Sequence, residues 1–172
     1  MRCGCGRLPL RRRAADRCGG QLAAVLVPGH RPQLGSTDRA QETRGVAGGD
    51  GFGEIVGIRL RNERGKFAVR GSRQGIFIAA VPPQPTLFVC EGPTDTAAAV
   101  DLGLFAVGRP NCCCGGADLK IFARRHQCQR VVMISDNDKP GLDGARKVGT
   151  EIQLPFAVYV PPAKDLREFV QF

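Results

Sequence analysis

Short apolar runs alternate with helix-length segments through the second half of the chain. The runs cover residues 87–90, 104–107, 131–135 and 156–160, and turn residues flank them. Brief β-prone runs separated by helical stretches are typical of βαβ units, whose strands form a buried parallel sheet. We therefore predict an α/β fold for residues 86–172, in which a compact parallel sheet of about four strands is flanked by helices.

The segments between these runs carry local helix signals. Pro93 suits the first position of a helix, and Gly103 suits its end. A second helix is predicted over residues 117–126, a third begins at Pro140, and a short final helix follows Asp165. Each predicted strand except the last therefore leads into a helix and then into the next strand.

Two acidic clusters directly follow two of the predicted strands. Glu91 comes after the first strand, and Asp136 and Asp138 come after the third. Groups at the carboxyl ends of parallel strands converge on the crevice where ligands bind. Carboxylates held together repel one another, and a hard divalent cation with oxygen ligands relieves that repulsion. The pattern predicts a site for Mg²⁺ or Mn²⁺ that serves phosphate chemistry.

The positive charge of the chain is concentrated in its first part. The formal net charge is +9, and residues 1–75 hold 15 of the 25 Lys and Arg residues but only 6 of the 16 Asp and Glu residues. A basic region beside a neutral domain suits a polyanionic partner such as nucleic acid. Residues 1–50 show no helical or strand periodicity, so we expect a basic, poorly ordered segment there. For residues 1–50 alone, we favour a solvated Arg-rich tail over a nucleic-acid-binding arm.

Alternating residues between positions 54 and 80 predict a small β-meander. The alternating runs are 54–61, 66–70 and 76–78. Arg59, Arg61 and Arg70 are expected on its polar faces, where a solvated surface and a nucleic-acid-binding surface both stay open.

No apolar run of the sequence is long enough to cross a membrane, since residues 22–27 make up only a six-residue run. The basic start also lacks the long apolar core of a secretion signal. We therefore expect a cytoplasmic protein that has no membrane partner.

The motifs after the predicted strands resemble those of the Toprim domain, which primases, type IA and II topoisomerases and some nucleases and recombination proteins share. The matching residues are Glu91-Gly92-x-x-Asp95, Asp136-x-Asp138-x-x-Gly141, Lys164-Asp165 and, in the loop after the second strand, Val107 to Asn111. The second and third motifs most resemble the primase branch, particularly primases fused to helicases in phages and mobile elements. The resemblance covers residues 86–172, and the β-meander more weakly resembles the small β-region that precedes the domain in that branch.

This resemblance implies roles for the acidic residues. Glu91 would be the catalytic acid/base and would also face the metal, while Asp136 and Asp138 would bind Mg²⁺. Asp95 lies in the first turn of its helix, where a carboxylate stabilises the helix dipole, so a structural role stands beside ligation. Asp165 would either complete the acidic patch or cap the last helix.

Three basic residues lie in loops at the same predicted edge. Arg109, Lys139 and Lys164 are candidates to meet the phosphates of nucleic acid or nucleotides, with solvation as the alternative.

The resemblance implies a Mg²⁺-dependent nucleotidyltransferase of the DNA primase type. Its partners would be single-stranded DNA, nucleotides and a separately encoded replicative helicase. A Toprim nuclease would use the same carboxylates with water as nucleophile, and a non-enzymatic module of the recombination type would only bind DNA. A dinucleotide-binding fold is excluded because no Gly-x-Gly-x-x-Gly follows the first strand.

Overall fold

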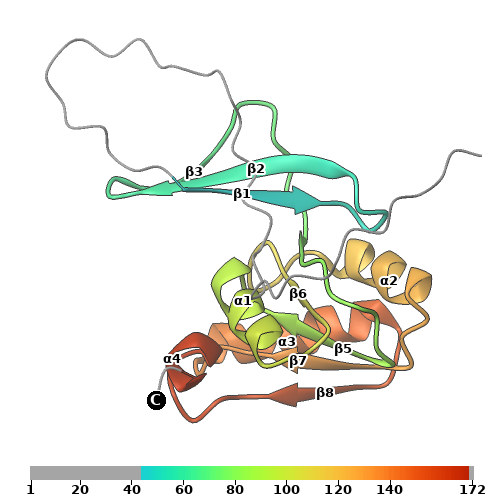
Figure 1. The fold of residues 1–172 in the computed structure, drawn as a ribbon. Helices are drawn as coiled ribbons and strands as arrows, with labels where there is room; N and C mark the ends of the chain where they lie inside the picture. Colours follow the sequence, from blue (N-terminus) through green and yellow to red (C-terminus); the bar gives the residue numbers. More distant parts are fainter. Residues whose placement is uncertain (1–43, 171–172) are drawn as a thin grey trace, which may run out of the picture.

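The computed structural model describes residues 44–170. Its main feature is a five-stranded sheet of order β4-β6-β5-β7-β8, in which β5 to β8 run parallel (Figure 1). These strands are β4 (Phe77–Ile78), β5 (Thr86–Cys90), β6 (Ala106–Gly108), β7 (Arg130–Ile134) and β8 (Phe156–Tyr159). The predicted α/β fold with parallel strands is confirmed, and β4 adds an antiparallel strand beside β6.

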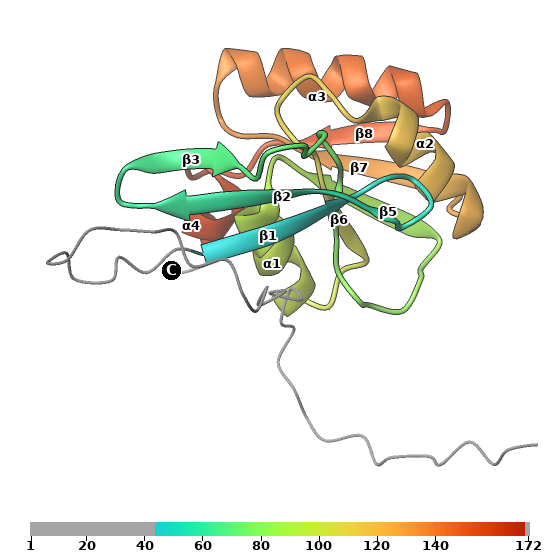
Figure 2. The same ribbon diagram turned by 90° about the horizontal axis from the view of Figure 1, so that it is seen from above.

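Helices cover both faces of this sheet. They are α1 (Pro93–Asp101), α2 (Gly116–Arg125), α3 (Lys139–Ile152) and α4 (Leu166–Val170). Seen from above, α2 and α3 lie on one side of the sheet and α1 and α4 on the other (Figure 2). All four helices begin within two residues of the predicted positions.

The alternation of side chains along each strand supplies a core on each face of the sheet. Leu87 and Val89 of β5 point into the larger cluster, which includes Leu119 of α2 and Val148 of α3. Cys90 belongs to a smaller cluster with residues of α1, β6, β7 and α4. A strand that is buried on both faces has apolar residues at consecutive positions, which explains why β5 and β7 could be predicted from the sequence.

A second, three-stranded antiparallel sheet precedes the α/β part. It consists of β1 (Arg44–Gly49), β2 (Ile55–Asn62) and β3 (Gly65–Ala68) in that order. Strands β2 and β3 match the first two runs of the predicted meander. Strand β1 lies inside the range predicted to be poorly ordered, because its glycines hide the alternation; residues 1–43 lie outside the described residues.

The third run of the predicted meander was assigned to the wrong sheet. Residues 76–78 were expected to complete the meander, but Phe77 and Ile78 form β4 and pair with Gly108 and Val107 of β6. Ile76 and Phe77 are almost wholly buried, at 0% and 3% exposed. Consecutive buried apolar side chains suit the covered edge of the larger sheet better than a strand with a solvated face.

Contacts at one corner fix the small sheet to the α/β part, beyond its β4–β6 edge (Figure 1). Gly49 and Ile76 exchange backbone hydrogen bonds of 2.8 and 2.7 Å. The N–H of Gly51 donates to Asp118 of α2 at 3.1 Å, and the guanidinium of Arg125 donates to the carbonyl of Phe52 and lies over its ring. The small sheet is therefore held in place by both the sheet edge and α2.

Within residues 44–170, no helix combines the length and the apolar character that crossing a membrane requires.

Candidate active site at the carboxyl edge of the parallel sheet

Three charged residues follow neighbouring strands at one edge of the large sheet. Because β6, β5 and β7 are adjacent, Arg109, Glu91 and Asp136 occupy successive positions along this edge. Cys90 pairs in register with Gly108, so Glu91 and Arg109 leave their strands at the same level. A side chain at Gly108 would collide with Thr96 Oγ1, since its Cβ would lie 2.4 Å away; glycine thus lets α1 pack closely against β6.

Glu91 lies between a cation and two other carboxylates. Its Oε2 is 3.3 Å from Nη2 of Arg109, and its side chain is 19% exposed. Burial raises the pKa of Glu91 above its ordinary value of 4.5, and repulsion from Asp136 and Asp138 raises it further, while Arg109 lowers it. The net direction is upward, so burial and carboxylate repulsion outweigh the ion pair.

Asp136 and Asp138 belong to the groove at the end of β7. Burial first, and then the charges of Asp95, Asp165 and Asp138, raise the pKa of Asp136 above its ordinary 3.8. Asp138 is the N-cap of α3, where its Oδ1 accepts a hydrogen bond of 2.7 Å from the N–H of Gly141. Only one of its two carboxylate oxygens serves that cap. Both residues line one groove with Lys139, Leu142 and Val160.

Asp95 and Asp165 have helix contacts of their own. Asp95 is 8% exposed, and its Oδ1 accepts a hydrogen bond of 3.1 Å from the N–H of Arg167, which ties α1 to α4. Burial, with a contribution from Asp165, raises its pKa. Asp165 accepts a 2.7 Å hydrogen bond from the N–H of Glu168 and so caps α4. Of the two roles considered for each residue, these contacts favour the structural one.

Arg109 lies in the expected loop, but its side chain is not exposed there. It was expected in a loop facing phosphates, but its side chain is completely buried. Nη2 meets Glu91, and Nη1 donates to the carbonyl of Cys112 at 2.5 Å. The pairing with Glu91 was missed because it requires knowing that β5 and β6 are neighbours in register. When β5 and β6 are aligned in register, Glu91 directly after β5 and Arg109 directly after β6 are seen to be neighbours.

The two lysines remain at the surface. Lys139 is exposed and forms an ion pair of 2.6 Å with Asp143, one helical turn away. Lys164 is exposed, and its carbonyl accepts a hydrogen bond of 2.9 Å from the N–H of Asn137. That bond holds the loop after β8 against the acidic motif after β7.

The chemistry of this edge fits a hard divalent cation. Its donors are carboxylate oxygens, and burial, followed by their mutual repulsion, raises the pKa values of Glu91 and Asp136. Among residues 44–170, however, no three Asp, Glu, His or Cys side chains already converge as a metal-binding group. The residues available to hold the ion are Asp136 and Asp138, with Glu91 beside them.

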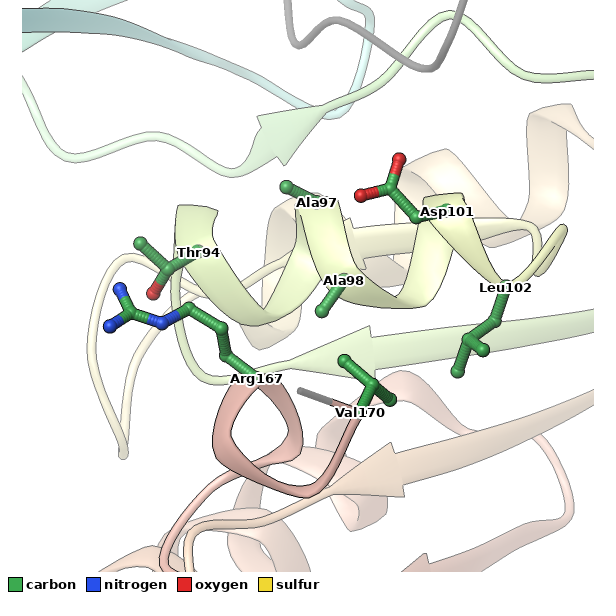
Figure 3. Close-up of a pocket in the computed structure, with 7 residues that line it drawn as sticks. All are labelled: Thr94, Ala97, Ala98, Asp101, Leu102, Arg167 and Val170. Atoms are coloured by element: carbon green, nitrogen blue, oxygen red, sulfur yellow. The ribbon is translucent and has the colours of Figure 1, made fainter. Parts of the chain in front are cut away.

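A second groove lies between α1 and α4 (Figure 3). Ala97, Ala98, Leu102 and Val170 form its apolar part, and the charged groups that line it are Asp101 and Arg167. The picture shows Arg167 directed toward Thr94, whereas Asp101 points away. A groove lined by one carboxylate and one cation has little to attract a metal, so the groove at the end of β7 is the better candidate for phosphate chemistry.

Comparison with known proteins identifies the fold. No protein-family model and no curated protein matches the chain, but solved primase structures do. The primase fragment of the bacteriophage T7 primase-helicase protein has a TM-score of 0.57 at 20% identity over 75% of this chain. The Aquifex aeolicus primase, comprising its zinc-binding and RNA polymerase domains, has a TM-score of 0.60 at 14% identity over 74% of this chain. The DnaG catalytic core has a TM-score of 0.56 at 18% identity over 78%.

These likenesses confirm the predicted primase-like fold. The chain covers 57% of the T7 fragment, 50% of the DnaG core and 36% of the Aquifex aeolicus chain. It therefore spans roughly half or less of these structures.

Proposed function

We propose that this chain carries the metal-binding centre of a primase-type nucleotidyltransferase, which extends a primer on single-stranded DNA from nucleotides. The observation that supports this most is the row of Arg109, Glu91 and Asp136 at the carboxyl ends of adjacent strands, with Asp138 two residues after Asp136 at the start of α3. Carboxylates that repel one another at such an edge need a cation, and nucleotide phosphates arrive with one.

Asp136 and Asp138 would hold the ion, and Glu91 would face it. A bound Mg²⁺ neutralises charge on phosphate oxygens and helps to place the reacting groups. Asp138 is already oriented by its bond to the N–H of Gly141, and Asp136 is partly buried at the strand end. These two side chains therefore present oxygens from a rigid strand end and a helix start.

Glu91 is suited to move a proton. Burial and the neighbouring carboxylates raise its pKa, which brings its proton affinity closer to what exchange at neutral pH requires. In the proposed reaction, the 3′-oxygen of the primer bonds to the α-phosphorus of the nucleotide as the bond to pyrophosphate breaks, and the Glu91 carboxylate accepts the proton of the attacking hydroxyl. Lys139 and Lys164 lie at the surface of the same edge and would meet phosphate oxygens of the nucleotide or the nucleic acid.

The structural likenesses support a nucleic-acid partner. One similar structure is the DnaG primase catalytic domain bound to single-stranded DNA, and another contains T7 primase domains bound to an RNA/DNA hybrid. Residues 1–75 of this chain hold its excess positive charge, which suits the same class of partner. We include in the proposal a separately encoded replicative helicase, a phage or mobile-element setting, and the cytoplasm as its location.

The test is primer synthesis by the full chain on single-stranded DNA with nucleotides and Mg²⁺, with and without EDTA. We expect short, metal-dependent products that disappear in Asp136→Asn. Metal-dependent shortening of the template without synthesis would identify the nuclease alternative, because water can attack a phosphodiester at the same carboxylates. DNA binding with neither product would identify a module that only binds.

A further inference from the structure

We infer that Arg109 is a positioning residue that fixes the Glu91 carboxylate and does not contact phosphate. This inference rests on the proposed function, since it assigns a part in that chemistry to a residue outside the metal-binding set. A phosphate-binding arginine presents its guanidinium to the ligand. The Arg109 side chain has no exposed surface, whereas Lys139 at the same edge is 88% exposed.

The contacts of Arg109 show what its charge is used for. Its backbone N–H donates to the carbonyl of Cys90 at 2.8 Å, which keeps the chain in register beside β5 beyond the end of β6. Nη2 reaches Glu91 at 3.3 Å, and Nη1 reaches the carbonyl of Cys112 at 2.5 Å. Nε is buried and has no hydrogen-bond partner among residues 44–170. Within residues 44–170, Glu91 is therefore the carboxylate that pairs with this buried charge.

Glu91 needs such a partner in order to stay in place. Asp136 and Asp138 on its other side repel its carboxylate. Without an opposing attraction, the side chain would turn out toward solvent, where the repulsion is screened. Arg109 supplies that attraction from the β6 side, so Glu91 is held between the cation and the other two carboxylates.

The second contact of Arg109 extends this support to the other acidic motif. The carbonyl of Cys112 packs so closely against Gly144 of α3 that a Cβ there would lie 2.0 Å from it. Helix α3 begins directly after its N-cap Asp138. Arg109 therefore links the Glu91 carboxylate, through one loop carbonyl, to the helix that orients Asp138. The rigid planar fork of the guanidinium holds these two partners in a fixed geometry, which the flexible ammonium of a lysine does not reproduce.

The test compares Arg109→Lys and Arg109→Met with Arg124→Met in the full chain. Arg124 is exposed in the last turn of α2, so its replacement controls for the loss of one positive charge. A phosphate contact contributes about 0.7 to the slope of log affinity for single-stranded DNA against log salt. We expect both Arg109 variants to keep the wild-type slope. We also expect Arg109→Met to lower kcat for primer synthesis about 10- to 100-fold with an unchanged nucleotide KM.

Arg109→Lys should retain more of the turnover than Arg109→Met, because a lysine can still pair with Glu91. A shallower salt slope or a raised nucleotide KM with unchanged kcat would overturn the inference, because either result means that Arg109 binds phosphate.

A readout that does not need catalysis separates this inference from the proposed function. NMR of the arginine side chains should show slowly exchanging Nη protons for Arg109, and Glu91→Gln should abolish that protection. If the chain makes no primer, the proposed function fails. The comparison of Arg109 proton exchange in the wild type and in Glu91→Gln then tests by itself whether Arg109 positions Glu91. The same NMR comparison tests the positioning role if neither Arg109 variant folds. Protection that persists unchanged in Glu91→Gln would overturn the inference.

Discussion

Glu91 combines two demands that conflict within a single side chain. It must ionise to accept a proton, yet burial and the charges of Asp136 and Asp138 favour its protonated form. The ion pair with Arg109 partly offsets this, and a divalent cation would offset more of it. The negative charge of these carboxylates is therefore not fully compensated by Arg109, and a cation bound from solution would compensate the rest.

Replacing Glu91 tests both sides of this balance. Glu91→Gln should reduce primer synthesis about 10²- to 10⁴-fold, because it removes the group that takes the proton. It should not lower the free energy of unfolding at pH 7, because the burial and carboxylate repulsion that it relieves outweigh the lost ion pair with Arg109. Urea unfolding of the variant beside single-turnover assays measures both effects. Wild-type synthesis by Glu91→Gln would remove Glu91 from the mechanism.

The raised pKa values predict how stability depends on pH in the absence of metal. Asp136 binds its proton more tightly in the folded chain than in the unfolded chain, so stability falls as pH rises from about 4 through its raised pKa. Asp136→Asn cannot ionise and should raise Tm at pH 7 in EDTA, and this gain should vanish below pH 4. Thermal unfolding at both pH values measures the difference. An equal loss of Tm in Asp136→Asn at both would show that Asp136 stabilises the fold through its contacts.

At the scale of elements, the strand–helix junctions decide how the site is oriented. The sequence was sufficient to predict β5 and β7, because runs buried on both faces are apolar throughout, and the acidic residues after them followed directly. It was not sufficient for β1, whose glycines carry no pattern, or for the sheet that β4 joins, because the run 76–78 shows a strand but not its neighbour β6. The burial of Arg109 depends on strand neighbours, which local patterns do not specify.

Asp138 has a structural and a functional part that two substitutions can separate. Asp138→Ser keeps an oxygen to accept the hydrogen bond from Gly141 but removes the carboxylate, whereas Asp138→Ala removes both. We expect Asp138→Ala to lower the free energy of unfolding by about 1 kcal/mol and Asp138→Ser by much less. Both should weaken Mn²⁺ binding equally. If only the alanine variant loses Mn²⁺, the cap and not the carboxylate matters for the metal.

At the scale of the whole molecule, a small basic sheet is fixed beside an acidic site. Arg59 and Arg61 lie two residues apart on β2, and Arg61 pairs in register with Lys66 of β3, so the three side chains share one face. Like charges directly opposite each other are unfavourable in a sheet unless a partner neutralises them. This face is therefore the part of the small sheet at which DNA binding can be tested.

Charge removal on this face should weaken DNA binding. The double change Arg59→Gln and Arg61→Gln should lower affinity for single-stranded DNA and reduce the salt slope by about 0.7 for each phosphate contact that is lost. Fluorescence anisotropy at several salt concentrations measures both quantities, with Arg124→Gln as a control on α2. Point changes suit this test better than truncation near residue 86, which would remove the buried residues Ile76 and Phe77. An unchanged slope would make this face a solvated surface.

The central claim is that the acidic edge of the large sheet binds a divalent cation, and a Mn²⁺ titration followed by electron paramagnetic resonance tests it most directly. The samples are the full chain, the double variant Asp136→Asn and Asp138→Asn, and a control double variant, Glu54→Gln and Asp101→Asn, which changes two exposed carboxylates elsewhere. We predict that the first double variant loses at least about 10-fold in affinity, as expected when ligands are removed, and that the control binds like the wild type. Superimposable titrations of all three proteins would contradict the account.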